Sequence, residues 1–208
     1  MILRKRRPGW TLTDWLKHLA ISWNWKMVDK DSVRIGPYVL ELTPYYFELL
    51  WREWRAWKNW YLPPWSLRGK TVLDIGAGCG ETALFYFYHG ASRVIAVEPE
   101  SSLLPLLRRN MSRNNWDMQV VEGPFQAKML EWKFDFMKMD GEGCESQLLT
   151  TNSIPPCAIE VHNKVVVDGL KEKFGMSILP QKENWILQNF TLKSTREGSG
   201  SEGAGRSA

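Results

Sequence analysis

Short apolar segments recur along residues 69–193 with the lengths and composition of strands. Residues 185–193 alternate apolar and polar positions, and we expect them to form an antiparallel edge strand paired with residues 176–180. Five other segments are rich in β-branched or aromatic residues and almost continuously apolar, which is typical of strands buried on both faces. They span residues 71–75, 93–97, 118–122, 134–139 and 157–162.

Two helices are predicted between the first three of these strands. Residues 81–90 have the sequence ETALFYFYHG and end at Gly90, a favourable residue just past a helix. Residues 101–115 are expected to be capped by Ser101, and Pro105 lies near the first turn, where proline is tolerated. This alternation predicts right-handed βαβ units in an α/β fold with a doubly wound, mostly parallel seven-stranded sheet of Rossmann-like type.

The chain divides into three regions by composition. Residues 1–68 hold nine of the twelve tryptophans and are predicted to be a largely helical extension that serves as a lid or binds an acceptor. Residues 69–193 carry the strand pattern and are expected to form the catalytic domain. Residues 194–208 are rich in Gly and Ser with no apolar residue larger than alanine, so we expect a disordered tail.

A helix over residues 45–61 would place tryptophans at every third position. Such a line drifts slowly around a helix and gives a broad aromatic ridge interleaved with basic residues. The ridge either packs against the sheet or forms an exposed surface that stacks a sugar, a base or an aromatic acceptor. Its members are Trp51, Trp54, Trp57 and Trp60.

Charge and cysteine usage narrow the class of protein. Arg4, Lys5, Arg6 and Arg7 account for the net charge of +4, so the chain as a whole is not a nucleic-acid binder by charge, although this basic arm could grip phosphates. The three cysteines lack the spacing of a zinc site, which favours a reducing, cytoplasmic location. We find neither a membrane-spanning run nor a secretory signal.

The segment TVLDIGAGCGETA, residues 71–83, carries the clearest chemical signal. Glycines at 76, 78 and 80 allow a tight turn and a close approach of backbone to ligand. A dinucleotide motif would place its third glycine at 81, but Glu81 stands there and would repel a pyrophosphate at the start of the next helix. Asp74 can hold an amino group or, through water, a ribose. S-adenosylmethionine, which has an ammonium and a sulfonium but no phosphate, suits this loop.

Residues that follow the later strands extend the same site. Glu98, at the end of the second strand and about 20 residues past the glycines, can accept hydrogen bonds from ribose hydroxyls. We therefore expect S-adenosylmethionine to be bound by a set of residues at the strand ends. This set consists of Asp74, Gly76, Ala77, Gly78, Gly80, Glu98, Pro99, Glu122 and Asp140.

The chain from VLDIGAGCGETALFY to ASRVIAVEPE resembles the class I S-adenosylmethionine-dependent methyltransferases. Within that superfamily, FMKMDGEGCESQLL at 136–149 and AIEVHN at 158–163 are similar to the FkbM type. The resemblance implies O-methylation of a small molecule or glycan and places Asp140 beside donor and acceptor. The absence of an NPPY-like motif after the fourth strand argues against methylation of a base amine.

Three side chains are candidates for the chemistry. Asp140 follows the fourth strand, and Glu160 and His162 lie at i and i+2 on the same side of the fifth. An oxygen acceptor usually needs its proton removed, and His162, with a pKa expected near neutrality, is the preferred base. These groups and Glu142 could also chelate a divalent ion, although we assign no metal. RNA or protein methylation and non-catalytic donor binding are the alternative functions; the sequence does not define the oligomeric state.

Overall fold

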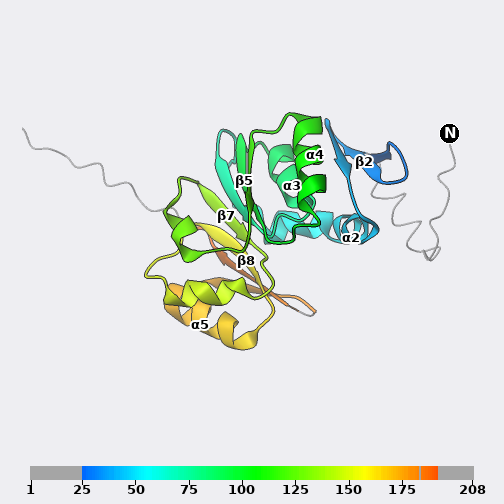
Figure 1. The fold of residues 1–208 in the computed structure, drawn as a ribbon. Helices are drawn as coiled ribbons and strands as arrows, with labels where there is room; N and C mark the ends of the chain where they lie inside the picture. The colour runs from blue at the N-terminus through cyan, green and yellow to red at the C-terminus, as the bar shows by residue number, and fades with distance from the viewer. Residues whose placement is uncertain (1–24, 183, 192–208) are drawn as a thin grey trace, which may run out of the picture.

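The computed structural model describes residues 25–182 and 184–191 (Figure 1). The basic arm at residues 4–7 and the Gly/Ser-rich tail at residues 194–208 therefore lie outside the described residues. Among the described helices, none is long and apolar enough to cross a membrane.

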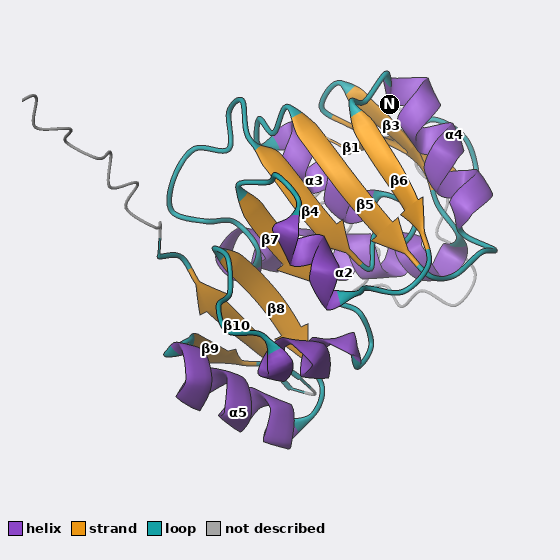
Figure 2. Cartoon of the chain, turned by 60° about the vertical axis from the view of Figure 1, so that its left-hand side comes forward, coloured by secondary structure: helices purple, strands orange, loops and turns teal. Residues whose placement is uncertain are grey.

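A seven-stranded sheet forms the centre of the molecule, in the order β6-β5-β4-β7-β8-β10-β9 (Figure 2). The first five strands in this order are parallel, whereas β10 runs antiparallel to both of its neighbours. The predicted strands are confirmed with small changes at their ends. Their bounds are β4 Thr71–Ile75, β5 Arg93–Glu98, β6 Met118–Glu122, β7 Phe136–Met139, β8 Cys157–Val161, β9 Ser177–Pro180 and β10 Trp185–Asn189.

Helices cover both faces of this sheet, which confirms a doubly wound architecture (Figures 1 and 2). One face carries the apolar core shared with α2, α3 and α4, and the other carries the core shared with η2, η3 and α5. The central strands have apolar side chains in both cores, as their nearly continuous apolar sequences require. The helical bounds are α2 Pro44–Trp60, α3 Glu81–Tyr88, α4 Leu104–Asn114, η2 Ala127–Glu131, η3 Cys144–Thr150 and α5 Lys164–Phe174.

Two details of the sheet and its helices differ from the sequence prediction. Helix α4 begins at Leu104 and not at Ser101, because Pro105 lacks an N–H and takes its place in the first turn, where no hydrogen-bond donor is needed. Strand β10 is antiparallel as predicted, but it is not the edge strand. It pairs with β8 and β9, and Ile186 and Leu187 are fully buried, so β9 lies at the edge.

The extension contains a small sheet that the sequence analysis did not predict. Strands β1 (Trp25–Met27), β2 (Ser32–Ile35) and β3 (Tyr38–Glu41) form an antiparallel meander. It is held to α4 by Asn110 and Asn114, whose side chains bond the backbone of β3 at 2.8 Å. The helix predicted over 45–61 is confirmed as α2.

The tryptophan ridge of α2 packs into the core. Trp51 and Trp57 are buried, and the rings of Trp54 and Trp57 meet Phe85 of α3 edge to face, with centroids 5.4 and 5.7 Å apart. The ridge is therefore not an exposed stacking surface, because α3 supplies an apolar partner for it. This packing leaves the opposite face of α2 to point toward the carboxyl edge of the sheet, where it lines a cavity.

Candidate functional site

A cavity of about 550 Å³ lies at the edge where the carboxyl ends of β4, β5, β7 and β8 meet. The strand order reverses between β4 and β7, and open α/β sheets bind ligands at such a switch point. The lining comes from the glycine loop, from the segments after β5, β7 and β8, and from α2. It includes Tyr45, Tyr46, Glu48, Arg52, Glu53, Gly76, Gly78, Glu81, Glu98, Pro99, Asp140, Glu142, Glu160 and His162.

Gly76 sets the path of the loop. Its φ of +73° disfavours any residue with a Cβ, and a Cβ there would overlap the backbone carbonyl of Asp140. The Gly76 N–H donates to the carbonyl of Val97 at 2.9 Å, and the Asp140 N–H donates to the carbonyl of Ile75 at 3.0 Å. Hydrogen bonds to β5 and from the segment after β7 thus fix the loop that follows β4.

Glu98 joins the glycine loop to the end of β5. One carboxylate oxygen accepts from the Gly78 N–H at 2.7 Å and the other from the Glu100 N–H at 2.8 Å. Burial raises the pKa of Glu98 despite these two donors. Glu98 and Pro99 both lie in the cavity wall, at the position that the sequence analysis expected for ribose recognition.

Four residues of the predicted donor set lie outside the cavity lining. Asp74 and Ala77 are fully buried beneath the loop, and Gly80, with φ +91°, provides the turn into α3. Glu122 is solvent-exposed and pairs with Arg108 at 3.6 Å. These residues shape or flank the loop, whereas Gly76, Gly78, Glu98, Pro99 and Asp140 face the cavity.

Lys138 of β7 is a residue that the sequence analysis missed. Its side chain is 1% exposed, and its Nζ lies 2.9 Å from the carbonyl oxygen of Gly76, 3.5 Å from Asp74 and 3.9 Å from Asp140. Asp74, whose pKa burial raises, therefore acts as the partner of Lys138 in this structure. The sequence did contain a signal for this residue, because Lys138 lies within a strand predicted to be buried on both faces. A buried lysine almost always has an oppositely charged partner.

Glu81 also enters the cavity, although its sequence position was used only to exclude a pyrophosphate. It is 3% exposed, and its carboxylate accepts from the Cys79 N–H at 2.9 Å. A Cβ at Gly78 would meet this carboxylate and the ring of Tyr46, so Gly78 keeps the space between them open. Burial raises the pKa of Glu81 to about 8. The loop thus presents an acidic group but no cation to a ligand.

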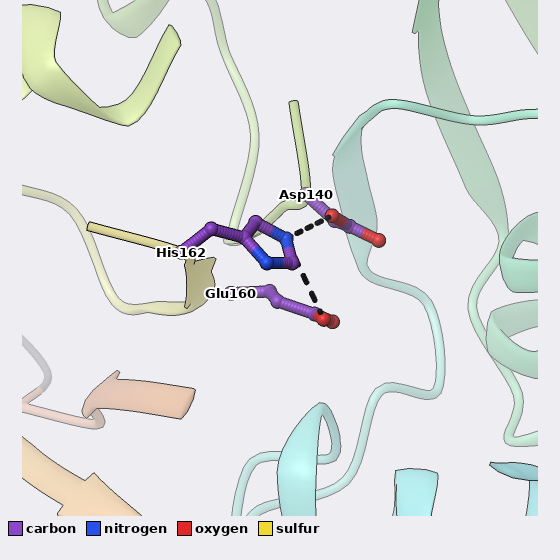
Figure 3. Close-up of side chains that lie close together, drawn as sticks. All are labelled: Asp140, Glu160 and His162. Atoms are coloured by element: carbon purple, nitrogen blue, oxygen red, sulfur yellow. Dashed lines mark ion pairs between the residues drawn. The ribbon is translucent and has the colours of Figure 1, made fainter. Parts of the chain in front are cut away.

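Asp140, Glu160 and His162 also line the cavity and lie close together, as the sequence analysis expected (Figure 3). The His162 Nε2 lies 3.9 Å from Asp140 and 3.8 Å from Glu160. Glu160 is 8% exposed and accepts hydrogen bonds from the Tyr61 hydroxyl and the Asn184 side-chain amide. The sequence analysis did not predict Tyr61 or Asn184 as partners of Glu160. Tyr61 follows the end of α2 and Asn184 precedes β10, so both lie far from Glu160 along the chain.

The protonation of these groups differs from the sequence expectation. The interaction with Asp140 is the largest cause that raises the pKa of His162 to about 9, so at neutral pH the imidazole is a cation and not a ready base. Burial and the nearby charge of Asp140 raise the pKa of Glu160 to about 7. Burial acts to raise the pKa of Asp140, but Lys138 and His162 outweigh it and lower the pKa. Glu160 is therefore the better placed proton acceptor.

The same three side chains offer one ligand atom each within 4.8 Å of one another. This spacing could hold a divalent ion, the alternative considered from the sequence. A protonated His162 offsets one of the two carboxylate charges without an ion.

No family profile matches the chain. Among curated proteins, it is 30% identical over 110 residues to the uncharacterized protein 158B of Sulfolobus islandicus rod-shaped virus 1, covering 52% of this chain and 69% of that protein. It is 36% identical over 90 residues to the human electron transfer flavoprotein beta subunit lysine methyltransferase, covering 42% of this chain. The chain spans only 34% of the human protein's length.

Solved structures show a more distant likeness. The fibrillarin of Aeropyrum pernix, determined with natively bound S-adenosyl-L-methionine, aligns with a TM-score of 0.46 and 13% identity, covering 59% of this chain and 67% of that one.

Proposed function

We propose that this chain, which belongs to the class I S-adenosylmethionine-dependent methyltransferases, binds S-adenosylmethionine beside its glycine loop and transfers the methyl group to a nucleophile in the same cavity. The observation that carries this proposal is one cavity lined by two groups of residues. The glycine loop and Glu98 form the group that we call the donor end, and the cluster of Asp140, Glu160 and His162 forms the group that we call the acceptor end.

The donor end fits the ligand in shape and in charge. Side chains are absent where Gly76 and Gly78 face the cavity, and a Cβ at either position would meet neighbouring atoms. Glu98 offers oxygens suited to ribose hydroxyls, and Glu81 offers an acidic group that can ionise opposite an ammonium. Together they favour a cationic, phosphate-free nucleoside.

Bound there, S-adenosylmethionine supplies a methyl group already activated by its sulfonium. The protein then has to align the acceptor, exclude water and take up a proton. Glu160 suits the last task, because its carboxylate is buried yet reaches the cavity. Tyr61 and Asn184 hold that carboxylate in place, and the cationic His162 keeps Asp140 ionised beside it.

The nature of the acceptor remains a prediction. An oxygen acceptor on a small molecule or glycan rests on the FkbM resemblance of residues 136–149 and 158–163. The human relative is named for methylation of a lysine, which favours protein methylation as the second candidate. Both acceptors require the nucleophile to lose a proton, so the roles given to the cavity residues apply to either.

Calorimetry with matched variants tests donor binding. Glu98→Gln removes an acceptor from the cavity wall and should weaken S-adenosylmethionine binding by about tenfold, the loss expected for one good hydrogen bond. Glu122→Gln changes a residue of the same type at the end of the next strand, but outside the cavity, and should leave affinity unchanged. Equal losses in both variants, or tight binding of NAD and none of S-adenosylmethionine, would contradict the proposal.

A methyl-transfer assay distinguishes an enzyme from a protein that binds S-adenosylmethionine without transferring its methyl group. The full chain is incubated with methyl-labelled S-adenosylmethionine and fractionated lysate, with and without a chelator. We expect label in an acceptor fraction, and a decrease of at least about tenfold in Glu160→Gln if this residue takes the proton. Donor binding without any labelled product would identify a non-catalytic protein.

A further inference from the structure

The acceptor end of the cavity is strongly acidic. Helix α2 contributes the carboxyl groups of Glu48 and Glu53, and the ends of β7 and β8 contribute three more, Asp140, Glu142 and Glu160. Among the described lining residues, the basic side chains are Arg52 and His162. Carboxyl groups therefore outnumber cations where an acceptor would lie.

Both basic side chains are already engaged by carboxylates. The Arg52 guanidinium lies 4.0 Å from Glu48, on the same face of α2. The His162 imidazole lies within 4.0 Å of Asp140, Glu142 and Glu160. The excess of carboxyl groups persists after these pairs are formed, so the cavity attracts a cation and repels an anion.

Aromatic rings stand beside this negative charge. Tyr45 is 68% exposed, an unusual exposure for so large a ring, and it packs edge to face on Tyr46 with the centroids 5.2 Å apart. Both rings line the cavity. Tyr45 lines the cavity together with Glu53 and Glu142, and slight burial and the negative charges of these two residues raise its pKa. A ring face next to carboxylates is a favourable environment for an ammonium group.

We propose that the acceptor is a cationic alkylamine, as in the side chain of a lysine. The inference rests on the proposed methyl transfer and specifies its substrate. The bound ammonium gives one proton to the Glu160 carboxylate, and the freed nitrogen lone pair forms the N–CH₃ bond as the C–S bond breaks. The electron pair of that bond stays on sulfur. The products are a methylammonium and S-adenosylhomocysteine, and the proton passes on to solvent.

The charge also discriminates against other acceptors. The phosphates of RNA would bring anions into a cavity where carboxyl groups outnumber cations, which costs binding energy. A neutral hydroxyl would gain nothing from the excess of negative charge. Oxygen methylation of a glycan, the expectation from the FkbM resemblance, would leave the excess of negative charge in the cavity uncompensated by the acceptor.

Two small probes of equal length test the proposal. N-acetyl-lysine methylamide carries the ammonium, and N-acetyl-6-hydroxynorleucine methylamide carries a hydroxyl in its place. Each is titrated by NMR into the full chain saturated with S-adenosylhomocysteine. We expect the amine to bind at least about tenfold more tightly than the alcohol, with the difference shrinking as salt is added.

A matched pair of variants tests whether the preference for the amine arises from the charge of the cavity. Glu142 is 83% exposed at its side chain, so Glu142→Gln should fold normally and reduce the preference for the amine severalfold. Glu172→Gln removes the same charge from an exposed position on α5 and should not change it. Equal binding of the two probes, tighter binding of the alcohol, or no binding of the amine would overturn the inference. If S-adenosylhomocysteine itself fails to bind, the proposed function fails instead.

Discussion

The strongest test of how the site is built is the replacement of Lys138 by methionine. The side chains are similar in length, so Lys138→Met removes the charge with little change in volume. Lys138 and Asp74 are 1% and 0% exposed, and the variant leaves the Asp74 carboxylate buried without its cation. It also removes the hydrogen bond that the Lys138 ammonium donates to the Gly76 carbonyl at 2.9 Å.

The expected cost follows from this burial. Breaking a buried ion pair by removing one partner typically destabilises a protein by about 3–5 kcal/mol, a large part of the total stability of a domain. Lys164→Met is the control, because Lys164 pairs with Asp168 on an exposed turn of α5. That pair is worth less than about 1 kcal/mol.

Urea denaturation followed by tryptophan fluorescence measures both variants. The double variant Asp74→Asn with Lys138→Met should be more stable than Lys138→Met alone, because it leaves no unpaired charge in the core. A loss in Lys138→Met no larger than that of Lys164→Met would refute the assignment of Lys138 as the support of the loop.

Three further predictions concern the loop and the titratable groups. Gly76→Ala should abolish donor binding in calorimetry, whereas Gly69→Ala, at a similar positive φ but with no neighbour within 4 Å, should only lower stability. Donor affinity should rise between about pH 6 and pH 8 as Glu81, with a pKa of about 8, ionises opposite a cationic ligand; Glu81→Gln should flatten that rise. The pKa of His162 is raised from 6.5 to about 9, so its contribution to stability is complete below pH 6.5 and is lost as the pH rises through about 9. Unfolding of His162→Gln should lack that component, and an unchanged pH profile would contradict the pairing with Asp140.

The sequence predicted those parts of the site that lie close together along the chain. The glycine loop and Glu98 follow strands with strong apolar patterns, and Glu160 and His162 lie on one strand, so their positions follow from strand geometry alone. The sequence could not predict that Asp74 pairs with Lys138, because that depends on the register between β4 and β7.

The small N-terminal sheet was missed for a related reason. Its strands are three or four residues long, too short to show a clear alternation, and they are stabilised by side chains of α4 that lie far along the chain. The pKa of His162 was also beyond reach, because it depends on carboxylates from two strand ends that only the folded sheet brings together.

Helix α2 has two faces with separate tasks. Trp57 and its neighbours fix the helix to α3, whereas Tyr45 and Glu48 face the cavity, are exposed and contribute little to the core. Substitutions on the cavity face can therefore change which acceptor is admitted without disturbing the donor loop or the stability of the fold. Relatives that share this sheet could diverge in substrate through one helical face alone, which makes α2 the natural segment to exchange when the specificity of this scaffold is redesigned.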